Sequence, residues 1–163
     1  MLIRESNIND FDAVWPIYQA SKQFMLDHNN PNQWNDIYPN EDDIKENLED
    51  DGYVVLDDED KIVGAFVFNQ NADEEAYQTI HDGSWINDKP YSVIHALATF
   101  GGRNGVGQFV LDWCWEKSKN IKIDTHKDNY PMRKLLKKNG YIECGTIVYS
   151  DVGERIALQK VDG

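Results

Sequence analysis

A glycine-rich turn in the second half of the chain limits the possible folds more than any other segment. Residues 101–107 read Gly-Gly-Arg-Asn-Gly-Val-Gly, and they join a predicted strand directly to a predicted helix. In such a turn, successive backbone N–H groups point inward, and the positive end of the helix dipole lies behind them. Glycines also let an anion approach the backbone closely. The turn therefore indicates either an anion-binding loop or an ordinary glycine turn before a helix.

Two familiar phosphate-binding loops match this turn poorly. A Walker A loop carries Lys and then Ser or Thr after its last glycine, whereas Gln108 and Phe109 follow here. A dinucleotide-binding loop belongs to the first strand–helix–strand unit of its domain. This turn begins only at residue 101, after strands that the pattern predicts to be antiparallel. Neither alternative has more than weak support.

The spacing of apolar residues predicts a mixed α/β (α+β) fold with helices on both faces of a central mixed sheet. The predicted order is strand, helix, helix, three strands, helix, strand, helix and two strands. Alternation along residues 91–98 predicts that Tyr91, Val93, His95 and Leu97 share one face of a strand. No linker divides the 163 residues, so we expect a single domain spanning residues 1–163.

The charge of the chain is strongly negative and unevenly distributed. The formal net charge is −13, which argues against a nucleic-acid partner because phosphate binding needs a basic face. Residues 1–75 hold 19 acidic residues and 4 Lys or Arg, whereas residues 117–138 hold 8 Lys or Arg and 2 acidic residues. The second segment could receive a polyanion and the first a cation, or both could be solvated faces.

Other features of the composition indicate a cytoplasmic protein without metal or membrane span. Cys114 and Cys144 fit neither a disulfide framework nor a metal cluster, so we expect reduced thiols. The four histidines are scattered, and no apolar run is long enough to cross a bilayer. A homodimer is possible, because dimers are the commonest assemblies of soluble proteins, and no sequence feature specifies it.

The glycine turn and the segments after it resemble the GCN5-related N-acetyltransferase (GNAT) superfamily over essentially the whole chain. The acetyl-CoA motif of that family is Gln/Arg-x-x-Gly-x-Gly/Ala, and residues 102–107 fall on it, with Gly102 where Gln or Arg is usual. The family then has a fifth strand, an Asn, a helix and a Gly-aromatic pair, matched here by residues 121–125, Asn129 and Gly140-Tyr141. The strings 93–95, 124–129 and 139–141 resemble a bacterial subgroup of mostly unassigned members.

The resemblance implies acetyl-CoA as co-substrate, with its pantetheine arm between parallel fourth and fifth strands that splay apart. Backbone groups of Leu97, Ala98 and Thr99 would pair with the arm, and Asn129 would bond it or order the end of the fifth strand. The pyrophosphate would be held by the backbone amides of Arg103, Asn104, Gly105, Val106, Gly107 and Gln108.

Acyl transfer to an amine needs a base, because an alkyl amine with a pKa near 10.4 is protonated at neutral pH. His95 on the fourth predicted strand is the first candidate, although it could be an ordinary histidine on a sheet face. Nearby acids in the 69–90 loop, including Asp82 and Asp88, are alternatives. The tyrosine that serves the family as general acid is replaced by Leu136, so Tyr149, Tyr141 or water would supply the proton.

Four aromatic residues are candidates for the walls of an acceptor pocket, because aromatic faces can hold a cation. They are Trp34, Tyr38, Trp85 and Tyr91. The sequence thus predicts an N-acetyltransferase acting on an amine of a small molecule or protein. A catalytically idle acyl-CoA-binding protein of the same fold is the alternative, and a binder of another nucleotide is a third, weaker hypothesis.

Overall fold

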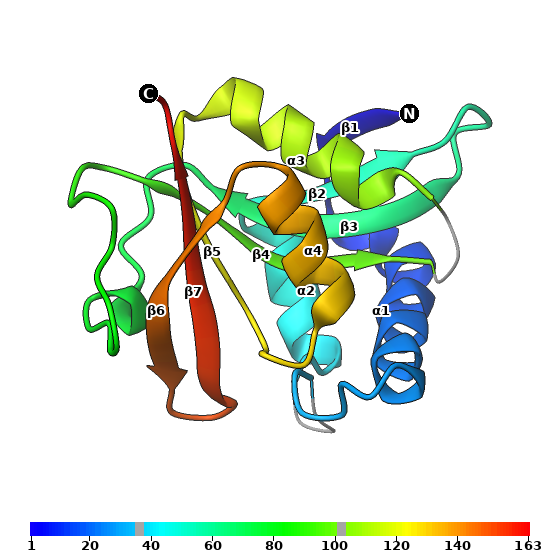
Figure 1. Cartoon of the computed structure of the whole chain (residues 1–163). Coiled ribbons are helices and arrows are strands. Elements are labelled where there is room, and N and C mark those ends of the chain that lie inside the picture. The colour runs from blue at the N-terminus through cyan, green and yellow to red at the C-terminus, as the bar shows by residue number, and fades with distance from the viewer. Residues whose placement is uncertain (35–37, 101–103) are drawn as a thin grey trace.

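The computed structural model describes residues 1–34, 38–100 and 104–163. Within these residues one seven-stranded sheet has the order β1-β2-β3-β4-β5-β7-β6 (Figure 1). All neighbouring strands are antiparallel except β4 and β5, which are parallel. The strands are β1 (Leu2–Glu5), β2 (Gly52–Leu56), β3 (Ile62–Asn69), β4 (Ser92–Thr99), β5 (Asn120–Thr125), β6 (Ile142–Tyr149) and β7 (Gly153–Val161).

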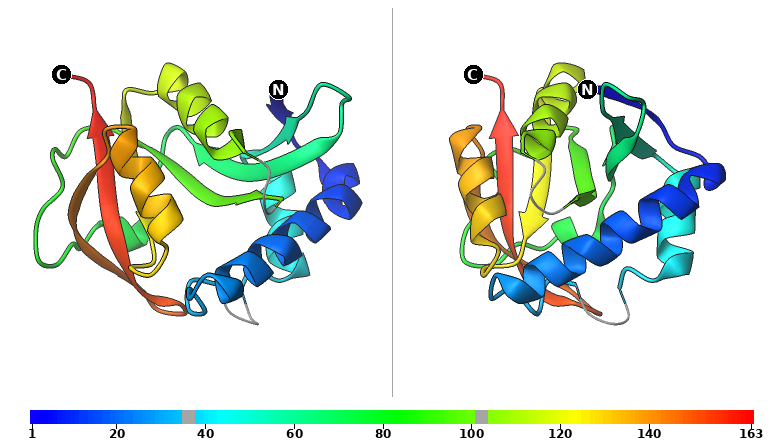
Figure 2. Two further views of the ribbon diagram at one scale, coloured as in Figure 1. Left: turned by 45° about the vertical axis from the view of Figure 1, so that its right-hand side comes forward. Right: turned by 90° about the vertical axis from the view of Figure 1, so that its right-hand side faces the viewer.

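Helices cover both faces of the sheet, which confirms the predicted fold class and element order. Figure 2 shows α1 (Phe11–Asp27) and α2 (Glu41–Glu49) on one side, away from α3 (Val106–Lys117) and α4 (Tyr130–Lys138). Two apolar clusters correspond to these two layers, one under α1 and α2 and the other under α3 and α4. Short 3-10 turns, η1 (Ile8–Asp10) and η2 (Glu75–Tyr77), complete the elements. No helix in the described part of the chain is long and apolar enough to cross a membrane.

Capping residues and glycines determine where α3 begins and where α4 begins and ends. The Asn129 side chain accepts a hydrogen bond from the Met132 amide, and Pro131 lies in the first turn of α4. Gly140, at φ +86°, follows the end of the same helix, as a C-terminal glycine commonly does. Gly105 precedes α3 at φ +87°, a conformation that favours glycine. Helix α3 therefore begins where the sequence predicted, within the glycine-rich segment 101–107.

The fourth and fifth strands separate after a short paired stretch. β4 pairs with β5 only at Ser92–Ile121 and Val93–Lys122, and no later pairs join them. A bulge in β4 then places Ala65 opposite Ala98 but Val67 opposite His95, so β4 has one extra residue there. Parallel strands that splay in this way confirm the arrangement that the resemblance implied.

The bulge corrects the predicted face of Leu97. Ala96 has φ +51°, and beyond it the alternation changes phase. Leu97 therefore packs with Ile94 in the cluster below α3, while His95 lies on the other face beside Tyr77. A simple period of two could not reveal this change, because an inserted residue shifts every later side chain to the opposite face.

Helix α1 holds the splayed half of β4 in place. The Tyr18 hydroxyl donates to the Ala96 carbonyl oxygen at 2.6 Å, and the Ser21 hydroxyl donates to the Thr99 carbonyl oxygen at 2.9 Å. Tyr18 is almost fully buried, and burial raises the pKa of its hydroxyl well above its usual range. The hydroxyl is therefore a permanent donor to the bulge, and the shape of β4 is fixed from the α1 side.

Candidate functional site

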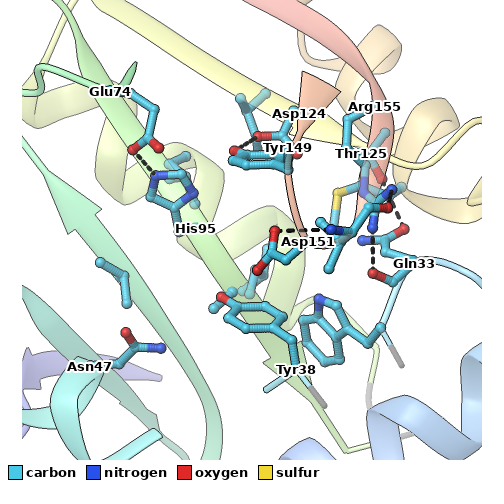
Figure 3. A pocket seen from close by; sticks show the side chains of 18 residues that line it. Gln33, Tyr38, Asn47, Glu74, His95, Asp124, Thr125, Tyr149, Asp151 and Arg155 are labelled. Atoms are coloured by element: carbon cyan, nitrogen blue, oxygen red, sulfur yellow. Dashed lines mark hydrogen bonds and ion pairs between the residues drawn. The ribbon is translucent and has the colours of Figure 1, made fainter. Parts of the chain in front are cut away.

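A cavity of about 300 Å³ lies where β4 and β5 separate (Figure 3). We call it the β4–β5 cavity. Its floor consists of residues 94–97 of β4 and 123–125 of β5. Its outer walls come from the segment between α1 and α2 and from the β6–β7 turn, and they include Gln33, Trp34, Tyr38, Asp151, Val152 and Arg155. Segments from both halves of the chain thus enclose one space.

His95 and Glu74 form a pair at one side of the cavity. The His95 Nε2 and Glu74 Oε2 atoms are 3.1 Å apart, and both side chains are partly exposed. The hydrogen bond from His95 lowers the pKa of the Glu74 carboxyl. A carboxylate that fixes one imidazole nitrogen also fixes the ring orientation, as a base requires. His95 therefore has the geometry of a base with an orienting partner.

Sequence reasoning did not single out Glu74 and named two other acids of the same loop. Asp82 is exposed and does not line the cavity, and Asp88 lines a different hollow. Glu74 stands between Asp73 and Glu75, and nothing in the local pattern separates these three acids. Only the position of Glu74 could have distinguished it, because this residue directly precedes the 3-10 turn that contains the buried Tyr77.

Asp124 holds two tyrosine hydroxyls at the end of β5. Tyr149 and Tyr77 each donate to the same carboxylate oxygen, Asp124 Oδ2, at 2.6 Å (Figure 3 labels Tyr149 and Asp124). Burial raises the pKa of both tyrosines far above neutrality. Tyr149, predicted as a proton donor, lines the cavity, and its proton is directed at Asp124.

Arg155 and Gln33 tie the outer wall to the sheet. Arg155 is 4% exposed and donates to backbone carbonyl oxygens of Val152, Glu154, Asn32 and Gln33. Gln33 Oε1 in turn accepts from the Thr125 hydroxyl, the His126 amide and the Asn129 side-chain amide. Asn129 thus orders the end of β5 through Gln33 and also caps α4.

The glycine turn opens α3 directly after the splayed end of β4. The first amides of an α-helix, here those of Val106, Gly107 and Gln108, have no acceptor within the helix. A Cβ on Gly105 would come no closer than 4.0 Å to the nearest atom, whereas one on Gly107 would meet Leu135 Cδ2 at 3.0 Å. Gly107 therefore also permits the contact between α3 and α4.

The other predicted cofactor residues lie around this turn. The Val106 side chain is buried in the core, and the Gln108 side chain bonds Asp112 and Asn139. Asn104 is exposed, and Arg103 lies outside the described residues. Leu97, Ala98 and Thr99 immediately precede the turn on the splayed part of β4.

The four predicted acceptor aromatics divide between two places. Trp34 and Tyr38 line the β4–β5 cavity, and burial raises the pKa of Tyr38 to about 12. Trp85 and Tyr91 do not line it. They flank Lys122, whose Nζ lies 4.3 Å and 4.0 Å from their ring centroids. These residues line a second, shallower depression, called here the Lys122 hollow, together with Asp73, Tyr77, Gln78, Asn87 and Asp88.

Metal-binding groups and disulfides do not appear in the described ranges. No group of three or more His, Cys, Asp or Glu side chains there is arranged to hold a metal ion. Cys114 is buried and Cys144 is partly buried, and both are free thiols. The described side chains that line the β4–β5 cavity include one histidine, three carboxylates and two tyrosines.

Comparison with known proteins places the fold among acetyltransferases. No protein-family model matches the sequence, and no curated protein is significantly similar to it. A solved GNAT-family acetyltransferase from Streptococcus agalactiae is 26% identical, with a TM-score of 0.86 over 99% of this chain and 95% of that one. GNAT-family acetyltransferases from Listeria monocytogenes (12% identity, TM-score 0.70, 98% and 93% covered) and Bacillus cereus (17%, 0.62, 99% and 98%) share the fold. These neighbours support an acyl-CoA N-acetyltransferase in general.

Proposed function

Because the chain belongs to the GCN5-related N-acetyltransferase superfamily, we propose that it transfers an acetyl group from acetyl-CoA to a primary amine of a small molecule or a protein. The observation that carries this proposal is the His95–Glu74 pair in the cavity between the splayed strands, on the strand that precedes the glycine turn and α3. The cavity supplies a base beside the gap in which the resemblance expects the pantetheine arm.

The described residues fit acetyl-CoA. Beyond Val93, β4 has no β5 partner, so one edge of Leu97, Ala98 and Thr99 is available to an extended arm. The amides at the start of α3, with Asn104 and Gly105 before them and the proposed contribution of Arg103, would hold the pyrophosphate. Bound acetyl-CoA supplies a thioester whose carbonyl carbon the amine attacks.

The chain's own residues then have separate tasks in the transfer. His95, oriented by Glu74, removes a proton from the incoming ammonium so that the neutral nitrogen can attack. A backbone amide near Leu97 or Ala98 donates to the carbonyl oxygen as it gains charge. A thiol with a pKa of about 8.5 would leave readily as its thiolate, so the chain would not need to supply a strong acid. The nitrogen would lose a second proton as the amide forms and the thiolate would gain one, so exchange with solvent balances the protons of the transfer.

The test of cofactor binding is a thermal-shift titration with acetyl-CoA. A ligand at 100 times its Kd stabilises the folded state by about 2.7 kcal/mol, which is easily measured. Gly105→Val is expected to abolish this shift, because it disturbs the positive φ and fills the turn. Gly153→Val is the matched control, since Gly153 also has positive φ but is the first residue of β7. No stabilisation by millimolar acetyl-CoA, or equal stabilisation of Gly105→Val, contradicts the proposal.

A specific observation favours the alternative of an idle acyl-CoA-binding protein. Leu136 is fully buried at the position where the family has the tyrosine that acts as general acid. The Tyr149 proton is directed at Asp124. The two functions separate in one assay. Acetyl-CoA binding with release of CoA thiol in the presence of amines supports the transferase, whereas binding without thiol release supports the idle protein.

A further inference from the structure

The Tyr149 hydroxyl presents its oxygen lone pair, not its proton, to the cavity. A hydroxyl has one proton, and Tyr149 directs it to Asp124 Oδ2 at 2.6 Å. Tyr77 donates to the same oxygen from the opposite, buried side. Burial strongly raises the pKa of Tyr149, and the nearby Asp124 carboxylate raises it further, because loss of the proton would place a phenolate against a carboxylate. Toward a substrate, Tyr149 is therefore an acceptor of hydrogen bonds.

Asp124 itself retains a second acceptor atom on the cavity side. The hydrogen bonds from Tyr77 and Tyr149 both reach Oδ2, and no described residue donates to Oδ1. Asp124 lines the cavity together with Glu74 and Asp151. Among the described lining residues, three carboxylates face one arginine, Arg155, which is buried and donates from Nη1 and Nη2 to backbone carbonyls. Hydrogen-bond acceptors with negative charge therefore face the space, together with the aromatic rings of Trp34 and Tyr38.

The Asp124 carboxylate and the Tyr149 oxygen are unsuited to hold the amine group that reacts. A carboxylate that stabilises an ammonium ion also opposes its deprotonation, whereas acyl transfer needs the neutral amine. His95 with Glu74 serves the reacting nitrogen. Asp124 with Tyr149 is then suited to a second nitrogen that stays charged throughout the reaction.

We propose that the acceptor is a short aliphatic diamine or polyamine, with Asp124 and Tyr149 positioning its non-reacting ammonium group. This inference rests on the proposed function and adds the substrate class to it. Asp124 is a positioning residue here, and Tyr77 holds its carboxylate in place from the buried side.

Equilibrium binding tests the inference without requiring turnover. Isothermal titration in the presence of CoA would compare three probes of equal chain length: 1,4-diaminobutane, n-butylamine and 4-aminobutanoate. Because only the first carries two ammonium groups, we expect it to bind about tenfold more tightly than n-butylamine, with 4-aminobutanoate the weakest. Asp124→Asn should remove about tenfold of the affinity for 1,4-diaminobutane and leave that for n-butylamine nearly unchanged.

The control variant is Asp82→Asn, which makes the same charge change outside the cavity. Asp82 is exposed and has φ +57°, a conformation that Asn adopts readily. If Asp124→Asn does not fold, Tyr149→Phe removes one acceptor oxygen and should selectively weaken the diamine. Equal affinity of the wild type for diamine and monoamine overturns the inference, as does equal loss in the Asp124 and Asp82 variants. Selective diamine binding without thiol release would support the inference and refute only the proposed function.

Discussion

The β4–β5 cavity and the Lys122 hollow are both walled by aromatic rings, and they differ in what those rings face. Trp34 and Tyr38 face a space lined by carboxylates, whereas Trp85 and Tyr91 face the ammonium group of the chain's own Lys122. A cation–π site already filled by an internal lysine has little to offer an external amine. Aromatic residues in polar loops therefore identify two sites of similar composition, of which only one is open to a cationic ligand.

The β4–β5 cavity and the Lys122 hollow lie on two sides of Tyr77, and residues adjacent in sequence belong to different sides. The Tyr77 ring lines the Lys122 hollow, while its hydroxyl bonds Asp124 of the β4–β5 cavity. Asp73 lines the hollow, and the next residue, Glu74, pairs with His95. Matched substitutions on the two sides of Tyr77 can therefore separate catalytic effects from structural ones.

The largest expected difference is in turnover. His95→Ala should lower the rate of CoA release by roughly 100-fold at neutral pH, because the base is lost. The rate should recover in part at high pH, where more of the amine is already neutral. Lys122→Met changes a cation on the other side of Tyr77 and should leave turnover nearly unchanged. Similar rates for the two variants would contradict the assignment of the base.

Adjacent acids give the second comparison. Glu74→Gln should lower kcat about tenfold, because it removes the charged partner that orients His95. The Michaelis constant for acetyl-CoA should stay close to normal. Asp73→Asn makes the equivalent change one residue earlier, in the Lys122 hollow, and should alter neither constant. Steady-state kinetics of both variants test this role of Glu74. An equal effect of the two substitutions would contradict the proposal that Glu74 orients His95.

The third comparison is between Trp34 in the β4–β5 cavity and Trp85 in the Lys122 hollow. Trp34→Ala should raise the acceptor's Michaelis constant about fivefold, since an aromatic face to a cation contributes on the order of 1 kcal/mol. Trp85→Ala should leave that constant unchanged but destabilise the fold, because the indole N–H donates to the Tyr77 carbonyl and the ring packs on Tyr77. Kinetics and thermal melts on both variants measure the contrast. If Trp34→Ala changes stability alone, Trp34 is not part of the acceptor wall.

The smallest effect concerns stability and pH in the Lys122 hollow. Burial lowers the pKa of Lys122, so at alkaline pH the unfolded chain holds this proton more tightly than the folded chain does. The free energy of unfolding should therefore rise with pH until the lysine titrates in the unfolded chain, near pH 10.4. Lys122→Met should lack this rise. Urea unfolding at pH 8 and pH 10 tests it, and parallel pH profiles of the two proteins would contradict the prediction.

The sequence by itself determined the order of the elements, the helix ends and the glycine turn. These depend on short-range physics: apolar spacing, the cap at Asn129, and glycines where φ is positive. The location in the cytoplasm, the single domain and a homodimer stay predictions from the sequence. His95 could be named because it lies on a recognisable strand before the turn.

Only the tertiary structure decided which residues meet in the cavity. Glu74 could not be distinguished from its acidic neighbours, and Asp124 gained a role only when Tyr77 and Tyr149 converged on it from 47 and 25 residues away. The bulge at Ala96 turned Leu97 away from His95 and helped to separate β4 from β5. Trp34 and Trp85 look alike in sequence, and they differ because one faces open carboxylates and the other Lys122. Such differences arise from contacts between distant segments, which no local pattern of residues encodes.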